Sequence, residues 1–338
     1  MWQTVFAAFQ TDPVWGLYTD SPAREAAALL EGRSLAACID SLEIIRVSGA
    51  DAETFLQGQT TCDFKEVAAG RWQLGAHCNA KGRIQASFRA LPLENDFLLL
   101  VPRGQGEPTR AALAKYALFS KVTLTLESHW LPLALLGPDA AGWCSGLFGA
   151  APAANDCLAL EKGLIAGLRD NAWLLLLSPE QAAEALSQLQ ASAIPLAGDN
   201  AWWLAEIQAG IAQIPEQLSE QWIPQEVNYD LVGGVNFKKG CYKGQEIVAR
   251  IHYRGQTKVR TRIVQIEGVE QAAPGTRIVS VSGQNLGTLL QSACVKKRTL
   301  MGLAVLKTDC SESETLQLEP NDGSQIRLMP MPYAINNE

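Results

Sequence analysis

The sequence has few of the side chains that usually build metal or redox centres. None of its eight cysteines stands in a C-x-x-C pair, and only three histidines occur in 338 residues. Zinc and iron–sulfur sites usually show closely spaced cysteines or histidines. We therefore expect no metal site. Scattered thiols of this kind are typical of proteins kept in a reducing compartment.

Long apolar runs and a secretory leader are also missing. No stretch approaches the roughly 20 apolar residues that a membrane-spanning helix needs. The N-terminus lacks a basic segment, and Gln10-Thr11-Asp12-Pro13 interrupts its apolar character. We expect a cytoplasmic, monomeric protein without membrane contact.

Net positive charge is absent too, since the formal charge is −7. General attraction to nucleic acid is therefore not expected. Lysines and arginines nevertheless crowd into residues 238–262. Such a segment is an ordinary solvated face or a positive surface for an anionic ligand, a polyglutamate tail or an RNA backbone.

The chain is too long for one ordinary core, and its patterns predict an α+β fold with three domains at 1–130, 131–254 and 255–338. In the first, strands at 42–47, 72–78, 83–91, 97–101 and 121–126 alternate with helices, including one at 108–118. This is the order of a ferredoxin-like unit with one extra strand.

The second segment repeats this order more loosely. Strands are predicted at 131–136, 158–165 and 172–177, with a turn at 167–170, and Ser178-Pro179 opens a helix to about 189. A helix at 201–211 leads into a long irregular loop, which is usually functional in a compact protein. From 258 onward, short strands between turn residues predict a small β-barrel.

The densest cluster of reactive residues follows the loop, at 238–250. Cys241 lies between glycines with three lysines nearby and close to a helix start, which favours the thiolate. Lys239 could stabilise that thiolate or hold an anion. Gln245 and Glu246 begin the helix, and Glu246 and Arg250 stand four residues apart, so an ordinary helical ion pair is the main alternative to a functional role.

The run 239–250 resembles the signature of the YgfZ-like folate-binding proteins, bacterial relatives of the glycine-cleavage aminomethyltransferase (T-protein). Further similarity lies at 47–59, 77–82, 115–122 and 223–225. The resemblance implies a ring-like arrangement of two ferredoxin-like units and a barrel around a folate-sized channel. It also implies tetrahydrofolate as cofactor, and a role in maintaining iron–sulfur enzymes, including a tRNA methylthiolase, and so in tRNA modification.

The same resemblance implies that Trp202 contacts the folate, although Trp203 beside it competes for this role. A second family tryptophan is replaced here by Leu42, which puts the pose of the folate in question. His77 and Cys78 are neighbours on a strand and point to opposite faces, so packing is the better interpretation than a shared metal.

Three rival functions follow from the same residues. A one-carbon transferase like the T-protein needs a catalytic aspartate where this chain has Gln85 and Ala86. We therefore expect no classical enzyme. A cysteine hydrolase needs a base beside Cys241, and His252 is the nearest histidine in the sequence. Direct tRNA binding through 250–262 is the third, and the overall acidity favours an indirect connection.

Overall fold

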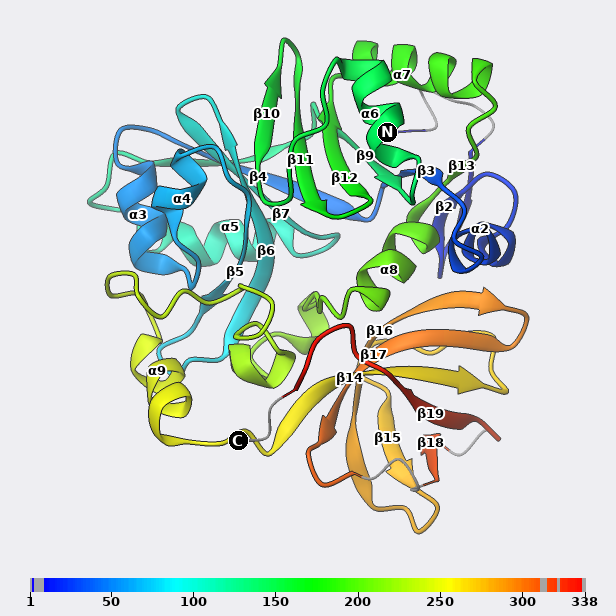
Figure 1. Ribbon diagram of the computed structural model, residues 1–338. Coiled ribbons are helices and arrows are strands. Elements are labelled where there is room, and N and C mark those ends of the chain that lie inside the picture. The colour runs from blue at the N-terminus through cyan, green and yellow to red at the C-terminus, as the bar shows by residue number, and fades with distance from the viewer. Residues whose placement is uncertain (1, 3–8, 311–314, 321–322, 336–338) are drawn as a thin grey trace.

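The computed structural model describes Trp2 and residues 9–310, 315–320 and 323–335. Most of the first eight residues, to which the prediction of no secretory leader refers, lie outside this description. A five-stranded sheet, a six-stranded sheet, a two-stranded hairpin, a closed β-barrel and helices make up the described part (Figure 1). The predicted α+β class with a C-terminal barrel is confirmed.

The first sheet has the predicted strands, in the antiparallel order β5-β6-β7-β4-β8. The helix predicted at 108–118 ends at Ala114, because the chain then turns so that the Lys121 N–H donates to Asp51 (2.7 Å). The elements are β4 (Leu42–Ser48), α3 (Ala52–Gln59), α4 (Phe64–Ala68), β5 (Gln73–Cys78), β6 (Ile84–Leu93), β7 (Asp96–Pro102), α5 (Gly106–Ala114) and β8 (Thr123–Glu127).

The second sheet corrects two predictions. The single strand at 158–165 is wrong: two strands meet at a turn at Glu161-Lys162, and the turn predicted at 167–170 lies at Asp170-Asn171, where Asn171 takes a positive φ of 60°. Strand β3 and helix α6 were not predicted. The elements are β3 (Leu35–Cys38), β9 (Leu131–Leu136), α6 (Ala140–Phe148), β10 (Cys157–Leu160), β11 (Gly163–Arg169), β12 (Ala172–Leu177), α7 (Pro179–Ala191) and β13 (Leu196–Ala197).

The two sheets share one topology. The second has the order β10-β11-β12-β9-β3-β13, which matches the first except that β3 stands between β9 and β13. Two related α+β units, as predicted, explain this match. The division at 130/131 and 254/255 stays a prediction, and β3 comes from the first of those segments although it pairs in the second sheet.

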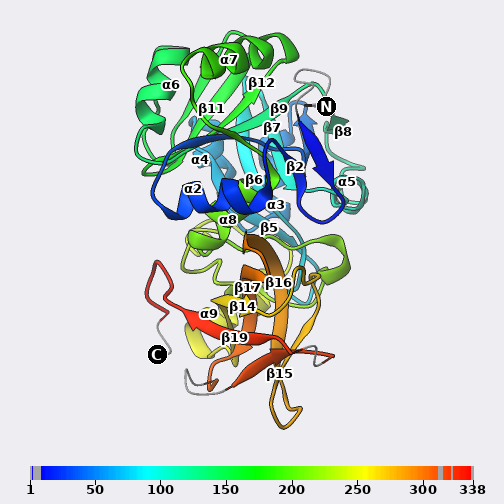
Figure 2. The same ribbon diagram turned by 90° about the vertical axis from the view of Figure 1, so that its right-hand side faces the viewer.

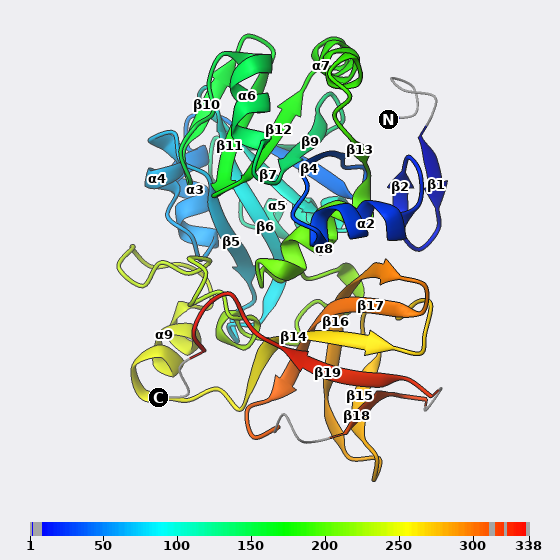
Figure 3. The ribbon, with the colours of Figure 1, turned by 45° about the vertical axis from the view of Figure 1, so that its right-hand side comes forward.

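Helix α8 (Asp199–Gln208) lies between the sheets and the barrel (Figure 1). Its first residue ties it to the N-terminal hairpin, because the buried Asp199 carboxylate accepts hydrogen bonds from the N–H groups of Leu17 (2.7 Å), Asp40 and Ser41 (both 2.8 Å). That hairpin is β1 (Gln10–Asp12) and β2 (Gly16–Tyr18), followed by α2 (Pro22–Leu30). In Figures 2 and 3 the hairpin and α2 lie beside the barrel strand β16.

The barrel closes in the order β14-β17-β16-β15-β18-β19. Strand β16 is longer than the short strands predicted for this segment, since it continues through irregular pairing between Leu289 and Gln291. The elements are α9 (Gln245–Arg254), β14 (Val259–Glu267), β15 (Arg277–Ser280), β16 (Asn285–Lys296), β17 (Thr299–Lys307), β18 (Leu316–Leu318) and β19 (Gln325–Met329). Among the described helices, none is long and apolar enough to span a membrane.

Candidate functional site

The Cys241 thiol lies on the surface, on the loop that precedes α9. Gly244 ends this loop in a left-handed conformation (φ 84°), and a Cβ there would stand 2.5 Å from the Asn79 carbonyl oxygen. Glycine is required at this position for both reasons. The tight turn places Cys241 outward and starts α9 against the β5–β6 hairpin.

Lys239 points away from solvent, toward the end of α3. Its ammonium donates to the carbonyls of Thr60 (2.8 Å) and Cys62 (2.5 Å), and only 9% of the residue is exposed. Burial lowers the pKa of Lys239 to about 8, and the neighbouring buried Cys62 partly opposes this shift. In the described part of the chain no hydrogen bond joins Lys239 to Cys241. The lysine therefore anchors the loop that carries the thiol.

Gln245, Glu246 and Arg250 lie on the first two turns of α9. Gln245 is half-buried, whereas Glu246 and Arg250 are exposed. The helical ion pair considered for Glu246 and Arg250 does not form among the described residues. Both charged groups are therefore available at the surface that follows Cys241.

Lys243 connects the loop to the first sheet. Its ammonium lies 4.3 Å from the centre of the Tyr116 ring and donates to Gln85 Oε1 (3.3 Å). Beyond Tyr116, Leu118 and Phe119 are 81% and 101% exposed. Cys241 precedes Lys243 by two residues in the same loop, and Lys243 contacts Tyr116, so we group Cys241, Lys243, Tyr116, Leu118 and Phe119 under the name Cys241 face. It combines positive charge with exposed apolar side chains, which is typical of a contact surface.

His77 lies beneath this face and packs edge-on against Tyr116. Its Nδ1 donates to the Gln59 carbonyl (2.9 Å), and burial lowers its pKa to about 4, so the ring is neutral at pH 7. Its Nε2 is buried without a hydrogen-bond partner in the described structure. Both His77 and Cys78 are buried, as the packing interpretation predicted.

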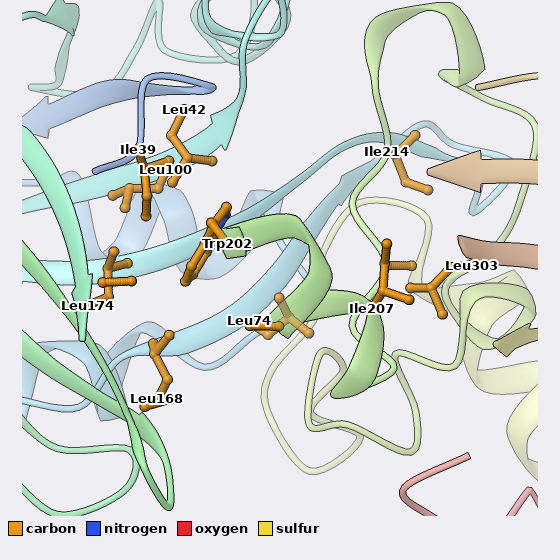
Figure 4. Close-up of a cluster of buried hydrophobic side chains, with 14 of the residues drawn as sticks. Ile39, Leu42, Leu74, Leu100, Leu168, Leu174, Trp202, Ile207, Ile214 and Leu303 are labelled. Carbon is orange, nitrogen blue, oxygen red and sulfur yellow. The ribbon is translucent and has the colours of Figure 1, made fainter. Parts of the chain in front are cut away.

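Trp202 is fully buried and so offers no free ring face for a ligand. Figure 4 shows its indole among side chains of both sheets, including Leu100 and Leu174, with Leu42 in the same cluster. The Arg89 guanidinium lies 5.2 Å from the centre of the indole ring. Leu42, which stands where the resemblance led us to expect a second tryptophan, is therefore also a core residue.

Trp203, the next residue, lines a cleft between the N-terminal hairpin, α8 and the barrel. An apolar cavity of about 630 Å³ and a more polar one of about 360 Å³ adjoin there and share Trp15, Trp203 and Ser292. We call the two cavities together the cleft. Its size is typical of sites for small organic ligands. From the sequence alone, Trp203 was only an alternative to Trp202 for the expected contact with folate.

The cleft and the Cys241 face are separate. No residue from 236–250 lines either cavity of the cleft, and α8 and α9 lie in different parts of the molecule (Figures 1 and 3). The structure thus does not bring Trp202 or Trp203 together with Cys241. His252 stacks on Phe237, with ring centres 3.6 Å apart, and no hydrogen bond within the described residues joins it to Cys241.

Sequence reasoning missed two buried glutamines in the cleft, Gln213 and Gln291. A signal existed for the first, because Gln213 is a polar residue inside the otherwise apolar run 211–215. Near Lys243, Gln85 donates to Glu220 (2.7 Å), so a carboxylate lies beside the residue at which the resemblance led us to look for an aspartate. Within the described residues, no group of three metal-binding side chains occurs.

Two family models match the chain. Residues 13–172 match the GCVT N-terminal domain, and residues 260–332 match the C-terminal β-barrel domain of CAF17. Among solved structures, the glycine cleavage system aminomethyltransferase T from Bartonella henselae aligns with a TM-score of 0.70 over 97% of this chain and 95% of that protein. At 15% identity this match shows a common fold.

Curated relatives share more sequence. The tRNA-modifying protein YgfZ of Aliivibrio fischeri (strain MJ11) is 31% identical over 87% of this chain and 91% of its own length. The protein of the same name from Photobacterium profundum is 31% identical over 89% and 92%. That from Escherichia coli O45:K1 is 27% identical over 94% and 99%. The chain therefore belongs to the family of the YgfZ tRNA-modifying proteins.

Proposed function

We propose that this protein binds tetrahydrofolate and supports iron–sulfur enzymes that modify tRNA, among them a tRNA methylthiolase, in the cytoplasm. It acts as an accessory protein with a ligand site and a separate contact surface. Its relatives are named tRNA-modifying proteins, and its fold is that of an aminomethyltransferase. The cleft that Trp203 lines is the observation that carries the folate half of this proposal.

The cleft suits a folate in shape and chemistry. Half-buried indoles at Trp15 and Trp203 offer flat apolar surfaces for a pterin or aminobenzoyl ring. Arg103 lines the polar cavity beside three carboxylates, and the guanidinium donors that its pair with Asp40 leaves unused can bind a glutamate tail. Trp202 then has an indirect role, because it fixes α8 in the core and so presents Trp203.

Calorimetric titration with tetrahydrofolate tests this half. Trp203→Leu should weaken binding at least tenfold, because a large aromatic surface is lost. Trp143→Leu is the matched control, since Trp143 is equally half-buried but lies on α6, outside the cleft. If tetrahydrofolate titrated into the unaltered protein produces no heat of binding and leaves the tryptophan fluorescence unchanged, folate binding is refuted.

The Cys241 face carries the second half. An exposed thiol on the loop that carries Lys243, together with the exposed apolar pair that follows Tyr116, is suited to contact a protein, and Lys239 holds the loop in place. Contact of this kind connects the protein to tRNA indirectly, through the modifying enzyme. It agrees with a net charge of −7, which disfavours a long RNA interface.

Complementation of cells that lack the protein tests the thiol. Cys241→Ser should strongly reduce methylthiolated tRNA, whereas Cys294→Ser, at a half-buried thiol on the barrel, should restore it fully. Equal restoration by the two variants would remove Cys241 from the mechanism. Because Cys241 is exposed, a loss of activity in Cys241→Ser should not be complicated by loss of folding.

A one-carbon transferase is the second candidate, and one observation favours it. The Glu220 carboxylate bonds to Gln85, where the T-protein has its aspartate. Formation of methylenetetrahydrofolate from an aminomethyl donor, abolished by Glu220→Gln, would support this alternative. Absence of that product with saturating tetrahydrofolate would leave the accessory role alone.

A further inference from the structure

Gln213 and Gln291 are buried polar residues in the wall of the apolar cavity. They are 2% and 8% exposed, yet both side-chain atoms of Gln213 and the Nε2 of Gln291 lack a hydrogen-bond partner in the described structure. Amides buried in this way are unfavourable unless something bonds to them. A ligand in the cavity is the group that can supply those bonds.

The two amides are held in fixed places. Gln291 Oε1 accepts from the backbone N–H of Gln213 (2.9 Å), which leaves the Nε2 donors of Gln291 free. The backbone on either side of Gln213 is fixed as well, because Tyr229 donates to the Ala212 carbonyl and the Ile214 N–H donates to Ser87 (both 2.7 Å). Both amides are therefore held in the cavity wall with unused Nε2 donors and one unused acceptor, Gln213 Oε1.

The walls around these amides are largely apolar, and among the described residues Glu319 is the one charged residue in the lining. Trp203, Pro215, Pro274 and Leu290 are among them. A planar, uncharged heterocycle with an N–H donor beside a carbonyl or ring-nitrogen acceptor complements this arrangement. A pterin ring has such an edge, whereas an aminobenzoyl group does not.

We propose that Gln213 and Gln291 determine the specificity of the cleft by bonding to the edge of a pterin-like ring, and that they set the direction in which the ligand lies. This inference rests on the proposed folate function and adds the residues that select the ring. The ring occupies the apolar cavity. Its acidic tail lies in the adjoining polar cavity, toward Arg103.

Arg103 is well placed for the tail. It lies on the segment after β7, its side chain is 58% exposed, and it pairs with the Asp40 carboxylate (2.8 Å) while donating to the Asp40 carbonyl. The pair keeps the guanidinium at the rim of the polar cavity. A glutamate carboxylate can then bind the remaining donors of the guanidinium.

Calorimetry with the full-length protein tests the ring contact. Gln213→Leu should lower the affinity for tetrahydrofolate at least tenfold and leave the affinity for p-aminobenzoylglutamate, which has no pterin, unchanged. Gln213→Met replaces the amide with a side chain of similar size. The same loss of affinity in both variants would show that the loss does not come from a local packing defect. The control is Gln181→Leu, which removes a glutamine with an unpartnered oxygen outside the cleft and should bind tetrahydrofolate normally.

The outcomes separate this inference from the function on which it rests. If the unaltered protein binds tetrahydrofolate and both Gln213 variants bind it equally well, the ring contact is overturned while the proposed function stands. If the unaltered protein binds none, the proposed function fails and the inference fails with it. A tenfold loss restricted to ligands that contain the pterin supports both.

The direction of the ligand has its own test. Arg103→Gln should weaken tetrahydrofolate several-fold but leave tetrahydropteroate, which lacks the glutamate, unaffected. Arg33→Gln, at an exposed ion pair with Glu31, is the control. Equal effects of Arg103→Gln on the two ligands would overturn the proposed direction.

Discussion

The cleft and the Cys241 face differ in almost every physical property. The cleft is concave. Its larger cavity is mostly apolar and has buried amide atoms without partners in the described part of its wall, whereas its smaller cavity is polar. The Cys241 face is exposed, carries lysine and apolar side chains, and has its thiol in contact with solvent. The first is suited to a small molecule and the second to a macromolecule. Ligand and thiol thus have separate places in one chain.

One buried ion cluster joins the elements that carry the two regions. Arg89 on β6 pairs with Glu206 on α8, both nearly without exposure, and Arg169 adds a second contact to Glu206 (3.2 Å). Gln85, to which Lys243 donates, is the second residue of β6, whereas α8 carries Trp203. Removal of the cluster should therefore damage both regions together.

The largest effect is expected for Arg89→Met. It leaves the Glu206 carboxylate buried with one cation instead of two, which should cost about 3–5 kcal/mol of the free energy of unfolding. Denaturant unfolding measures this loss, and folate binding and tRNA modification should fall in parallel. Arg110→Met, in an exposed pair with Glu107, is the control and should cost less than about 1 kcal/mol. Loss of only one activity would contradict a shared frame.

Gly244→Ala should disturb the Cys241 face alone. The positive φ and the Asn79 carbonyl 2.5 Å from the new Cβ predict a loss of about 2–4 kcal/mol in the free energy of unfolding. Methylthiolation should fall while affinity for tetrahydrofolate, measured on the folded fraction, is kept. Gly240→Ala has open space around its Cβ and should change stability little. A parallel loss of folate affinity would show that the regions are coupled.

Local patterns predicted most strands, because alternation and turn residues are written within a few positions. The pairing of β3 with β9 was not predictable in this way, since it joins residues 35–38 to residues 133–136. The same limit applies at the site. Trp202 and Trp203 point about 100° apart on a helix, and only the packing of α8 decides which one reaches the cleft. Gln213 and Gln291 meet across 78 positions of sequence.

Lys239 links the Cys241 face to the first sheet, and its titration should report on that link. The pKa is about 8 in the folded state and near 10.5 in the unfolded state. Below pH 8 both states hold the proton and folding carries the full cost of burying the ammonium. Between pH 8 and 10.5 the unfolded state binds more protons, so the free energy of unfolding should rise with pH, by at most about 3 kcal/mol.

Denaturant unfolding at pH 7.5 and pH 10 measures this rise. Lys239→Met should lose it, whereas Lys238→Met, at the exposed neighbouring lysine, should keep it. Tyrosines and the other lysines also change the free energy of unfolding in this pH range, but they do so equally in both variants, so the difference between the variants reports on Lys239. The same rise in both variants would mean that Lys239 is not buried as a charged group, and the loop would then need another anchor.

The smallest effect on stability is expected on α9, and it separates function from folding most cleanly. Glu246 and Arg250 are exposed, and the described residues show no ion pair between them. Glu246→Gln and Arg250→Gln should each change the free energy of unfolding by no more than about 0.5 kcal/mol. If the Cys241 face extends along α9, both variants should still reduce methylthiolated tRNA in complementation, with folate affinity unchanged. Arg33→Gln, at another exposed arginine, should reduce neither. Because Glu246 and Arg250 are exposed, a loss of activity in these variants would reflect a lost contact rather than a folding defect. Full activity of both variants would instead confine the contact surface to the loop and to the Tyr116–Phe119 segment.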